Sequence, residues 1–245
     1  MPVLTDMDSH QIKGSNFGFS AKRIDDLGAT EYTLVGIAAD VSGSVEPFRQ
    51  EIESCIKEIV KSCQHSPRAD NLMMRLVTFD DRLEEVHGFR PLSECNLDSY
   101  SGCVRCGGMT ALYDAACNLT DSVTQYGRSL TESDFDVNAI VFVVTDGMDN
   151  RSAMTVGEVK KALGRAVQSE ALESVVSILV GVNVQDPQVS RYLTDLKDQA
   201  GFTQYVEIGS ATAKSLARLA DFVSRSISAQ SQALGTGGPS QSLSF

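Results

Sequence analysis

The stretch "EYTLVGIAADVSGSVEPF" at residues 31–48 decides the fold of this chain. Its first part, up to Asp40, is a nearly continuous apolar run of strand length, which is typical of a strand that is covered on both faces. A helical pattern begins soon afterwards, with Phe48, Ile52 and Ile56 at helical spacing. A buried strand that leads directly into an amphipathic helix is the repeating unit of a mostly parallel sheet with helices packed against it.

The same alternation continues to the end of the chain. We predict further strands at 71–79, 137–146, 174–182 and 203–208, and helices at 44–63, 110–127, 156–167, 187–200 and 212–229. The sequence therefore predicts an α/β fold with an open, mostly parallel, doubly wound (Rossmann-like) sheet and helices on both faces. The segment 82–92 is expected to be extended at a sheet edge, and 15–24 to form a further short edge strand.

Composition limits the function classes. The chain has 245 residues, 42% of them hydrophobic, which is enough for one large domain. We divide it into an N-terminal extension (1–28), a domain (29–230) and a flexible tail rich in Gly, Ser and Gln (231–245). A formal net charge of −11 disfavours nucleic acid and anionic membrane as partners. With neither a secretory signal nor a membrane-spanning run, we expect a cytoplasmic protein.

The chemistry is expected at the carboxyl ends of the strands, where open α/β sheets bind their ligands. Asp40 and Asp146 each end a buried strand. Ser42 and Ser44 follow the first of these, and Thr110 lies at the start of a helix after two glycines. Two carboxylates and three hydroxyls form a set of hard oxygen ligands, which suits Mg²⁺ or Mn²⁺, with Ca²⁺ as a third choice.

A simpler interpretation exists for part of this set. Asp40, Ser42 and Ser44 could form a helix-capping turn, with Ser44 as the cap, because serine is favoured at that position. The matching contexts of Thr110 and Asp146 favour the metal site. Asp149 and Asn150 fit turn formers better than ligands.

The full pattern resembles the metal-ion-dependent adhesion site (MIDAS) of von Willebrand factor type A (VWA) domains. "DVSGS" at 40–44, Thr110 and the "TDG" that contains Asp146 occur in the order and contexts of that family, and the resemblance covers roughly residues 29–230. It implies one short antiparallel edge strand, for which 82–92 is the natural candidate. It also implies direct metal contacts from Ser42, Ser44 and, in some conformations, Thr110, with Asp40 and Asp146 often acting through water.

The resemblance also implies a function. A VWA domain of this type is a non-enzymatic protein-interaction module, in which an Asp or Glu of a partner protein completes the coordination of the cation. "GGMTALYDA" at 107–115 is similar to the threonine loop of intracellular bacterial and phage members. Some of these are thought to work beside AAA+ ATPases, which suggests such a system as the partner.

Two other functions stay open from the sequence. A Mg²⁺-dependent hydrolase or phosphotransferase could use the same strand end, but phosphoaspartate enzymes need a second carboxylate where Ser42 stands, and no P-loop is present. A docking component of a phage or multiprotein assembly could use the same fold.

The cysteines raise a separate question. "CVRC" at 103–106, with Cys95 nearby, could hold zinc or form a redox pair, and His87 is the nearest histidine. A closed zinc site needs two more soft ligands than C-x-x-C supplies. We therefore expect Cys95, Cys103 and Cys106 to be free thiols on a loop beside the cation site.

Overall fold

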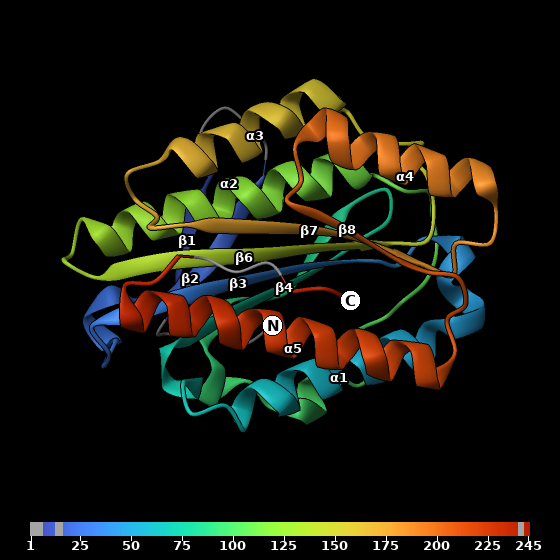
Figure 1. The fold of residues 1–245 in the computed structure, drawn as a ribbon. Helices are drawn as coiled ribbons and strands as arrows, with labels where there is room; N and C mark the ends of the chain where they lie inside the picture. Colours follow the sequence, from blue (N-terminus) through green and yellow to red (C-terminus); the bar gives the residue numbers. More distant parts are fainter. Residues whose placement is uncertain (1–6, 13–16, 240–242) are drawn as a thin grey trace.

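A single mixed sheet forms the centre of the computed structural model, which describes residues 7–12, 17–239 and 243–245 (Figure 1). Within these residues the sheet has eight strands in the order β1-β2-β5-β4-β3-β6-β7-β8. The strands are β1 (Met7–Gln11), β2 (Gly18–Lys22), β3 (Glu31–Asp40), β4 (Leu72–Phe79), β5 (Leu83–Pro91), β6 (Asp136–Thr145), β7 (Val175–Val182) and β8 (Gln204–Ile208). The strands from β4 through β3, β6 and β7 to β8 are parallel.

Helices cover both faces of the sheet, which confirms the predicted fold class. They are α1 (Arg49–Gln64), α2 (Leu112–Thr131), α3 (Val156–Gln168), α4 (Pro187–Ala200) and α5 (Ala213–Thr236). Figure 1 shows α1 and α5 on one face and α2, α3 and α4 on the other. The carboxyl ends of the parallel strands, and the beginnings of α1 and α2, all lie at the right-hand side of that view.

The sequence of β3 is nearly continuously apolar because helices bury both faces of this strand. Val35 and Ile37 pack in the core beneath α1 and α5, whereas Leu34 and Ala38 pack in the core beneath α2. Gly36 lies between them, and a Cβ there would come within 2.9 Å of Leu119 Cδ1 on α2. The close approach of α2 to the sheet therefore requires glycine at this position.

The edge of the sheet differs from the prediction. β5, predicted as the antiparallel edge strand, does pair antiparallel with β4, but β2 lies beside it on its other side and β1 is outermost. β2 corresponds to the strand predicted at 15–24, of which residues 15 and 16 lie outside the described residues. The hairpin stays on the sheet because Phe19 and Ala21 are buried, and Phe19 packs edge-on against Phe89.

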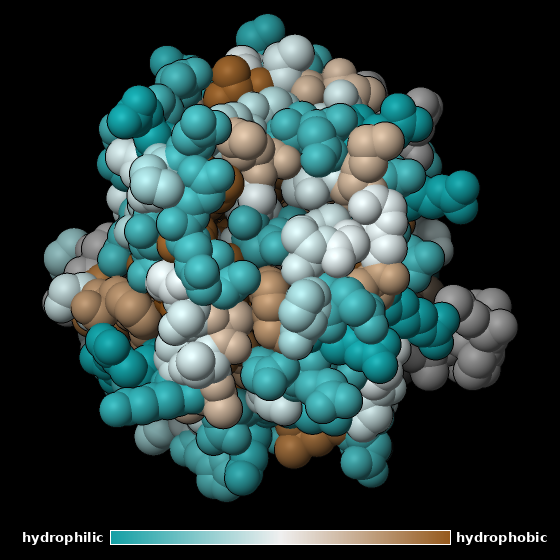
Figure 2. All heavy atoms as spheres, turned by 90° about the vertical axis from the view of Figure 1, so that its right-hand side faces the viewer, coloured by the Kyte–Doolittle hydropathy of each residue, from teal (hydrophilic) through white to brown (hydrophobic). Residues whose placement is uncertain are grey.

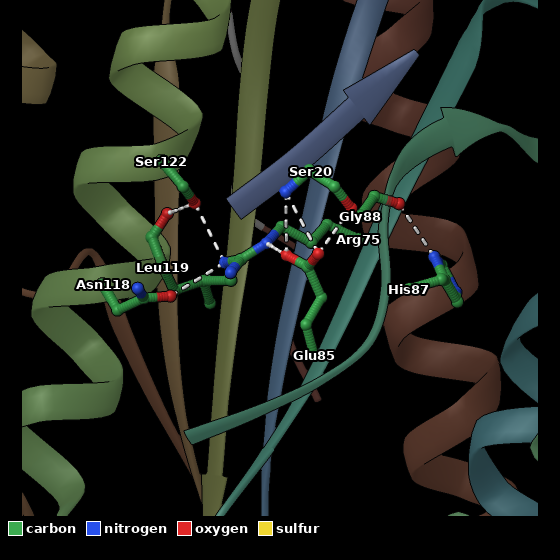
Figure 3. A network of polar contacts seen from close by, with 8 residues as sticks. All are labelled: Ser20, Arg75, Glu85, His87, Gly88, Asn118, Leu119 and Ser122. Carbon is green, nitrogen blue, oxygen red and sulfur yellow. Dashed lines mark hydrogen bonds and ion pairs between the residues drawn. The ribbon is translucent and has the colours of Figure 1, made fainter. Parts of the chain in front are cut away.

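A buried polar network ties this hairpin to the sheet and to α2 (Figure 3). Arg75 of β4, whose side chain is 2% exposed, donates from Nε to Glu85 Oε2 at 2.8 Å. Its Nη1 donates to Asn118 Oδ1 and Ser122 Oγ on α2. Glu85 in turn accepts hydrogen bonds from the backbone N–H and the hydroxyl of Ser20. One ion pair, between buried Arg75 and partly exposed Glu85, thus joins β2, β4, β5 and α2.

α5 continues past residue 229, where the sequence predicted its end, and finishes at Thr236. Gln230 and Ser231 are buried in this added length. Gln230 Nε2 donates to Ser174 Oγ at 2.8 Å, and Ser231 Oγ accepts from Arg68 Nε at 2.8 Å. The first residues of the predicted tail are therefore helical because their polar side chains have fixed partners in the body of the domain.

Candidate metal centre

Asp40 is held in one orientation at the end of β3. Its Oδ1 accepts from the backbone N–H of Ser42 at 2.8 Å, and its Oδ2 accepts from the hydroxyl of Thr145 at 2.6 Å. The residue is 3% exposed. Burial raises the pKa of Asp40 to about 6, against the opposite effect of the hydrogen bonds from Thr145 and Ser42. A carboxylate in this setting is electrostatically favourable for a cation beside it.

Ser42, Ser44 and Asp146 continue from Asp40 in an unbroken series of contacts. The hydroxyls of Ser42 and Ser44 lie 3.1 Å apart, and Ser44 Oγ donates to Asp146 Oδ1 at 2.9 Å. Burial raises the pKa of Asp146 as well. The structure thus brings four of the five predicted residues together, from two loops that are about 100 residues apart in sequence.

The hydroxyls do not act as helix caps. Residues Gly43–Phe48 form a 3₁₀ turn, and α1 begins only at Arg49, so Ser44 is not the cap of α1. Ser42, at the cap position of the 3₁₀ turn, makes no capping hydrogen bond through its side chain. The capping interpretation is therefore wrong, and both hydroxyls face the carboxylates instead.

The backbone of Thr110 is held at the same edge of the sheet by two hydrogen bonds with Asn150. Its N–H donates to Asn150 Oδ1 at 2.8 Å, and its carbonyl accepts from Asn150 N–H at 3.1 Å. Gly107 N–H donates to the carbonyl of Val41 at 2.9 Å, which fixes the start of the Thr110 loop beside Asp40. The structure describes all five predicted site residues. Among them, no hydrogen bond joins the Thr110 hydroxyl to the side chains of Asp40, Ser42, Ser44 or Asp146.

The loop after Asp146 also holds the beginning of α2. Ser152 Oγ accepts from the N–H groups of Tyr113 and Asp114 at 3.0 and 3.1 Å, and itself donates to Asp149 Oδ1. The carboxylate of Asp114 accepts in return from the N–H of Met154 at 2.8 Å. These reciprocal bonds leave little freedom for the position of Thr110 relative to Asp146.

Sequence reasoning missed two residues that position the site. Thr145 fixes Asp40, and Asn150 fixes Thr110. Thr145 directly precedes Asp146 in the quoted "TDG", so its place at the strand end was a usable signal. The sequence around Asn150 is typical only of a turn, because Thr110, to which Asn150 is bonded, is 40 residues away in sequence.

The residues fit a hard divalent cation. The set has two carboxylates and neutral hydroxyls only, which suits Mg²⁺ or Mn²⁺ and not a thiophilic metal. Within the part of the chain that the structure describes, no group of three or more His, Cys, Asp or Glu side chains could hold a metal. A cation at this edge would therefore depend on the serine and threonine hydroxyls as well as on Asp40 and Asp146.

The cysteines behave as free thiols. All six are unpaired with one another. Cys95 is buried, and burial raises the pKa of Cys103 and Cys106 to about 11. His87 is engaged elsewhere, with Nδ1 at 2.9 Å from the Gly88 carbonyl and Nε2 at 2.9 Å from the Tyr100 hydroxyl. The structure therefore shows neither a disulfide nor a cysteine–histidine metal site in the "CVRC" loop.

Comparisons by sequence give no match, either to a protein-family model or to a curated protein. Solved structures do match. The PilB minor pilin from Streptococcus sanguinis has a TM-score of 0.61 at 14% identity, over 90% of this chain and 66% of the pilin. The pilus adhesin SpaC from Lactobacillus rhamnosus GG, in its open conformation, has a TM-score of 0.56 at 11% identity, over 91% of this chain and 34% of the adhesin.

A third solved structure, proximal thread matrix protein 1 (PTMP1) from the mussel byssus, is described with a zinc-occupied MIDAS motif. It has a TM-score of 0.53 at 15% identity, over 82% of this chain and 47% of PTMP1. This chain has a VWA-like fold. At such identities the likeness shows the VWA-like fold alone, and the chain spans less than two thirds of each of these three proteins.

Among the described residues, no helix is both long and apolar enough to cross a membrane.

Proposed function

We propose that this VWA-like domain is a non-enzymatic protein-interaction module that works through a divalent cation. Ser42, Ser44 and Thr110 would hold Mg²⁺ or Mn²⁺, with Asp40 and Asp146 behind them. An Asp or Glu of a partner protein would complete the coordination. The observation that carries the proposal is the hydrogen-bonded series from Asp40 through the two serines to Asp146 at the carboxyl edge of the sheet.

The chemistry of the ligands explains why a partner carboxylate is needed. Hydroxyls are neutral, so a cation held mainly by Ser42, Ser44 and Thr110 keeps much of its positive charge. It then attracts one further anionic oxygen, and Asp and Glu are the side chains that supply one. The zinc-occupied MIDAS motif of PTMP1, a protein with a similar fold, supports the presence of a divalent cation at this site.

The cellular setting is part of the proposal. Six free thiols favour a reducing compartment, and with it a cytoplasmic protein. Some intracellular bacterial and phage VWA proteins with a threonine loop similar to 107–115 are thought to work beside AAA+ ATPases, and such a system would be the partner.

Metal binding is tested first. Chelator-treated protein is titrated calorimetrically with Mg²⁺, Mn²⁺ and Ca²⁺, and compared with Asp40→Ala and Ser44→Ala variants. Both substitutions should weaken binding at least about tenfold, since each removes an oxygen from the site. Asp198→Ala is the matched control, because Asp198 is an exposed acid on α4 whose ion-pair partner is its neighbour Lys197. Circular dichroism confirms that each variant is folded.

Partner capture is tested second. Immobilised protein is incubated with cell extract in Mg²⁺ or in EDTA, and the retained proteins are identified by mass spectrometry. The proposal expects partners that are lost both in EDTA and with Asp40→Ala, but kept with Asp198→Ala. Capture that is equal under all four conditions would contradict the metal-dependent mechanism.

A further inference from the structure

Large apolar side chains are rarely exposed on this protein. Among the described residues, the large apolar side chains that are exposed are those of Met109, Met148, Val167 and Phe245. Single exposed apolar residues are ordinary, so their location is what matters. Met109 is 50% exposed and Met148 is 42% exposed, and both lie on loops of the candidate metal centre. Val167 lies near the end of α3, and the Phe245 ring packs edge-on against Phe222.

The two methionines belong to loops that are bonded to each other. Met109 directly precedes Thr110, and Met148 follows Asp146 by two residues. The two hydrogen bonds between the backbone of Thr110 and Asn150 join these loops. Both exposed side chains therefore belong to the pair of joined loops that carries Thr110 and Asp146.

The backbone at each methionine is fixed. The N–H of Met109 donates to Asp81 Oδ1 at 2.5 Å. Met148 lies between Gly147, whose N–H donates to Thr145 Oγ1, and Asp149, whose N–H donates to the Tyr192 hydroxyl, both at 3.2 Å. A fixed backbone with a flexible thioether side chain is suited to packing against apolar groups of varied shape.

The surface beyond Ser44 has a different character. A groove of about 460 Å³ lies there, between the start of α1 and the loop 102–106. Four charged residues contribute to its lining, namely Glu46, Arg49, Glu53 and Arg105. Figure 2 shows this end of the molecule, where a mainly hydrophilic surface is interrupted by smaller hydrophobic areas. Val104 and Cys106 also line this groove, so it combines charged and apolar side chains, whereas Met109 and Met148 are large apolar side chains exposed on the loops of Thr110 and Asp146.

We propose that Met109 and Met148 select the residue next to the partner's metal-binding carboxylate. The partner is a protein segment that carries Asp or Glu with a large apolar neighbour such as Leu, Ile, Phe or Met. The carboxylate binds the cation by charge, and the apolar neighbour packs against the two methionine side chains. This inference rests on the proposed function, because the carboxylate places the segment on the surface.

The test is a selection from a random peptide library. Peptides are bound to the full chain in Mg²⁺ and eluted with EDTA. The inference expects the eluted pool to be enriched in Asp or Glu with a large apolar residue within two positions. Enrichment in Asp or Glu without an apolar neighbour would support the metal-dependent function and overturn this inference. A pool without enrichment in Asp or Glu, or the absence of any EDTA-eluted peptide, would overturn both the proposed metal-dependent function and this inference.

Variants then locate the contact. For a selected peptide, Met109→Ser with Met148→Ser should weaken binding about tenfold, as expected for losing one buried apolar contact. A copy of the peptide with Ser at the apolar position should bind about tenfold more weakly to the wild type, and equally to the wild type and the double variant. Val167→Ser is the control and should change neither affinity. The Mg²⁺ affinity of the double variant should equal that of the wild type, and an undiminished peptide affinity in that variant would overturn the inference.

Discussion

The hydroxyl of Thr145 donates a 2.6 Å hydrogen bond to Oδ2 of Asp40, so the last residue of β6 fixes the carboxylate at the end of β3. The two strands are parallel neighbours in the sheet, which is why residues 105 apart in sequence meet here. The other oxygen of Asp40 accepts from Ser42 N–H. The pairing of β3 with β6 places the Thr145 hydroxyl against one oxygen of the carboxylate, and the backbone directly after β3 holds the other oxygen.

Thr145→Val should weaken Mg²⁺ or Mn²⁺ binding about tenfold, because the substitution keeps the shape of the side chain but removes the donor that orients Asp40. Thr145→Ser restores a hydroxyl and should bind the metal within about threefold of the wild type. Calorimetric titration measures both. If Thr145→Val binds metal as tightly as Thr145→Ser, the orienting role is wrong.

The ion pair between buried Arg75 and partly exposed Glu85 makes a prediction for stability. Glu85→Ala leaves the Arg75 guanidinium buried without its anionic partner and should lower the free energy of unfolding by about 3 kcal/mol or more. Glu84→Ala is the matched control, since Glu84 is the exposed neighbour on the same strand and should change stability by less than about 0.5 kcal/mol. Urea denaturation followed by circular dichroism gives both values.

A double variant separates charge burial from packing. Arg75→Met combined with Glu85→Leu removes both charges and should be more stable than Glu85→Ala alone, because no unpaired charge is left in the interior. A double variant less stable than Glu85→Ala would show that the bonds of Arg75 to Asn118 and Ser122 matter more than its charge.

The central strands could be predicted because each carries its own signal. The apolar runs that end in Asp40 and Asp146 are buried on both faces, and strands of that kind have continuous apolar sequences. The predicted site residues follow from the same signal, since each lies directly after a strand end or before a helix. Thr145 also lies at a strand end, but its role depends on a partner 105 residues away, and that of Asn150 on a partner 40 residues away, which the local sequence does not reveal.

The sheet edge could not be predicted in full for a similar reason. β5 pairs antiparallel with β4 as predicted, yet β2 covers its other side through Phe19, Ala21 and the bonds from Ser20 to Glu85. Those contacts join positions 65 residues apart. The added length of α5 likewise depends on Gln230 and Ser231 bonding to Ser174 and Arg68, which polar composition alone does not reveal.

Gly88 allows β2 to lie against β5, which can be tested by substitution. A Cβ at Gly88 would come within 2.0 Å of the Ser20 carbonyl oxygen, so the backbone of β2 would have to move. Gly88→Ala should lower the free energy of unfolding by about 3 kcal/mol. Gly164→Ala is the control, because Gly164 lies inside α3 with nothing within 4 Å of the added Cβ. It should raise stability by about 0.5–1 kcal/mol, and equal effects of the two substitutions would contradict the close-approach argument.

His87 predicts how stability depends on pH. Burial lowers its pKa from 6.5 to about 4, the bond to the Gly88 carbonyl opposes this, and the nearby charges of Arg90 and Arg75 reinforce it. The ring also packs against Tyr100 and shares a hydrogen bond with its hydroxyl. Folding therefore keeps His87 neutral, whereas the unfolded chain takes up a proton below its ordinary pKa.

The sign follows from this difference. The contribution of neutral His87 is fully present above pH 6.5, decreases as the pH falls, and is lost by about pH 4. The total loss is about 3 kcal/mol over that interval. Urea denaturation of the wild type and of His87→Leu at pH 7.0, 5.5 and 4.5 measures it, because carboxylate titration is common to both proteins. The unfolding free energy of the wild type minus that of His87→Leu should decrease steadily toward low pH, because only the wild type loses the contribution of neutral His87. Parallel curves for the two proteins would show that His87 does not titrate in this range.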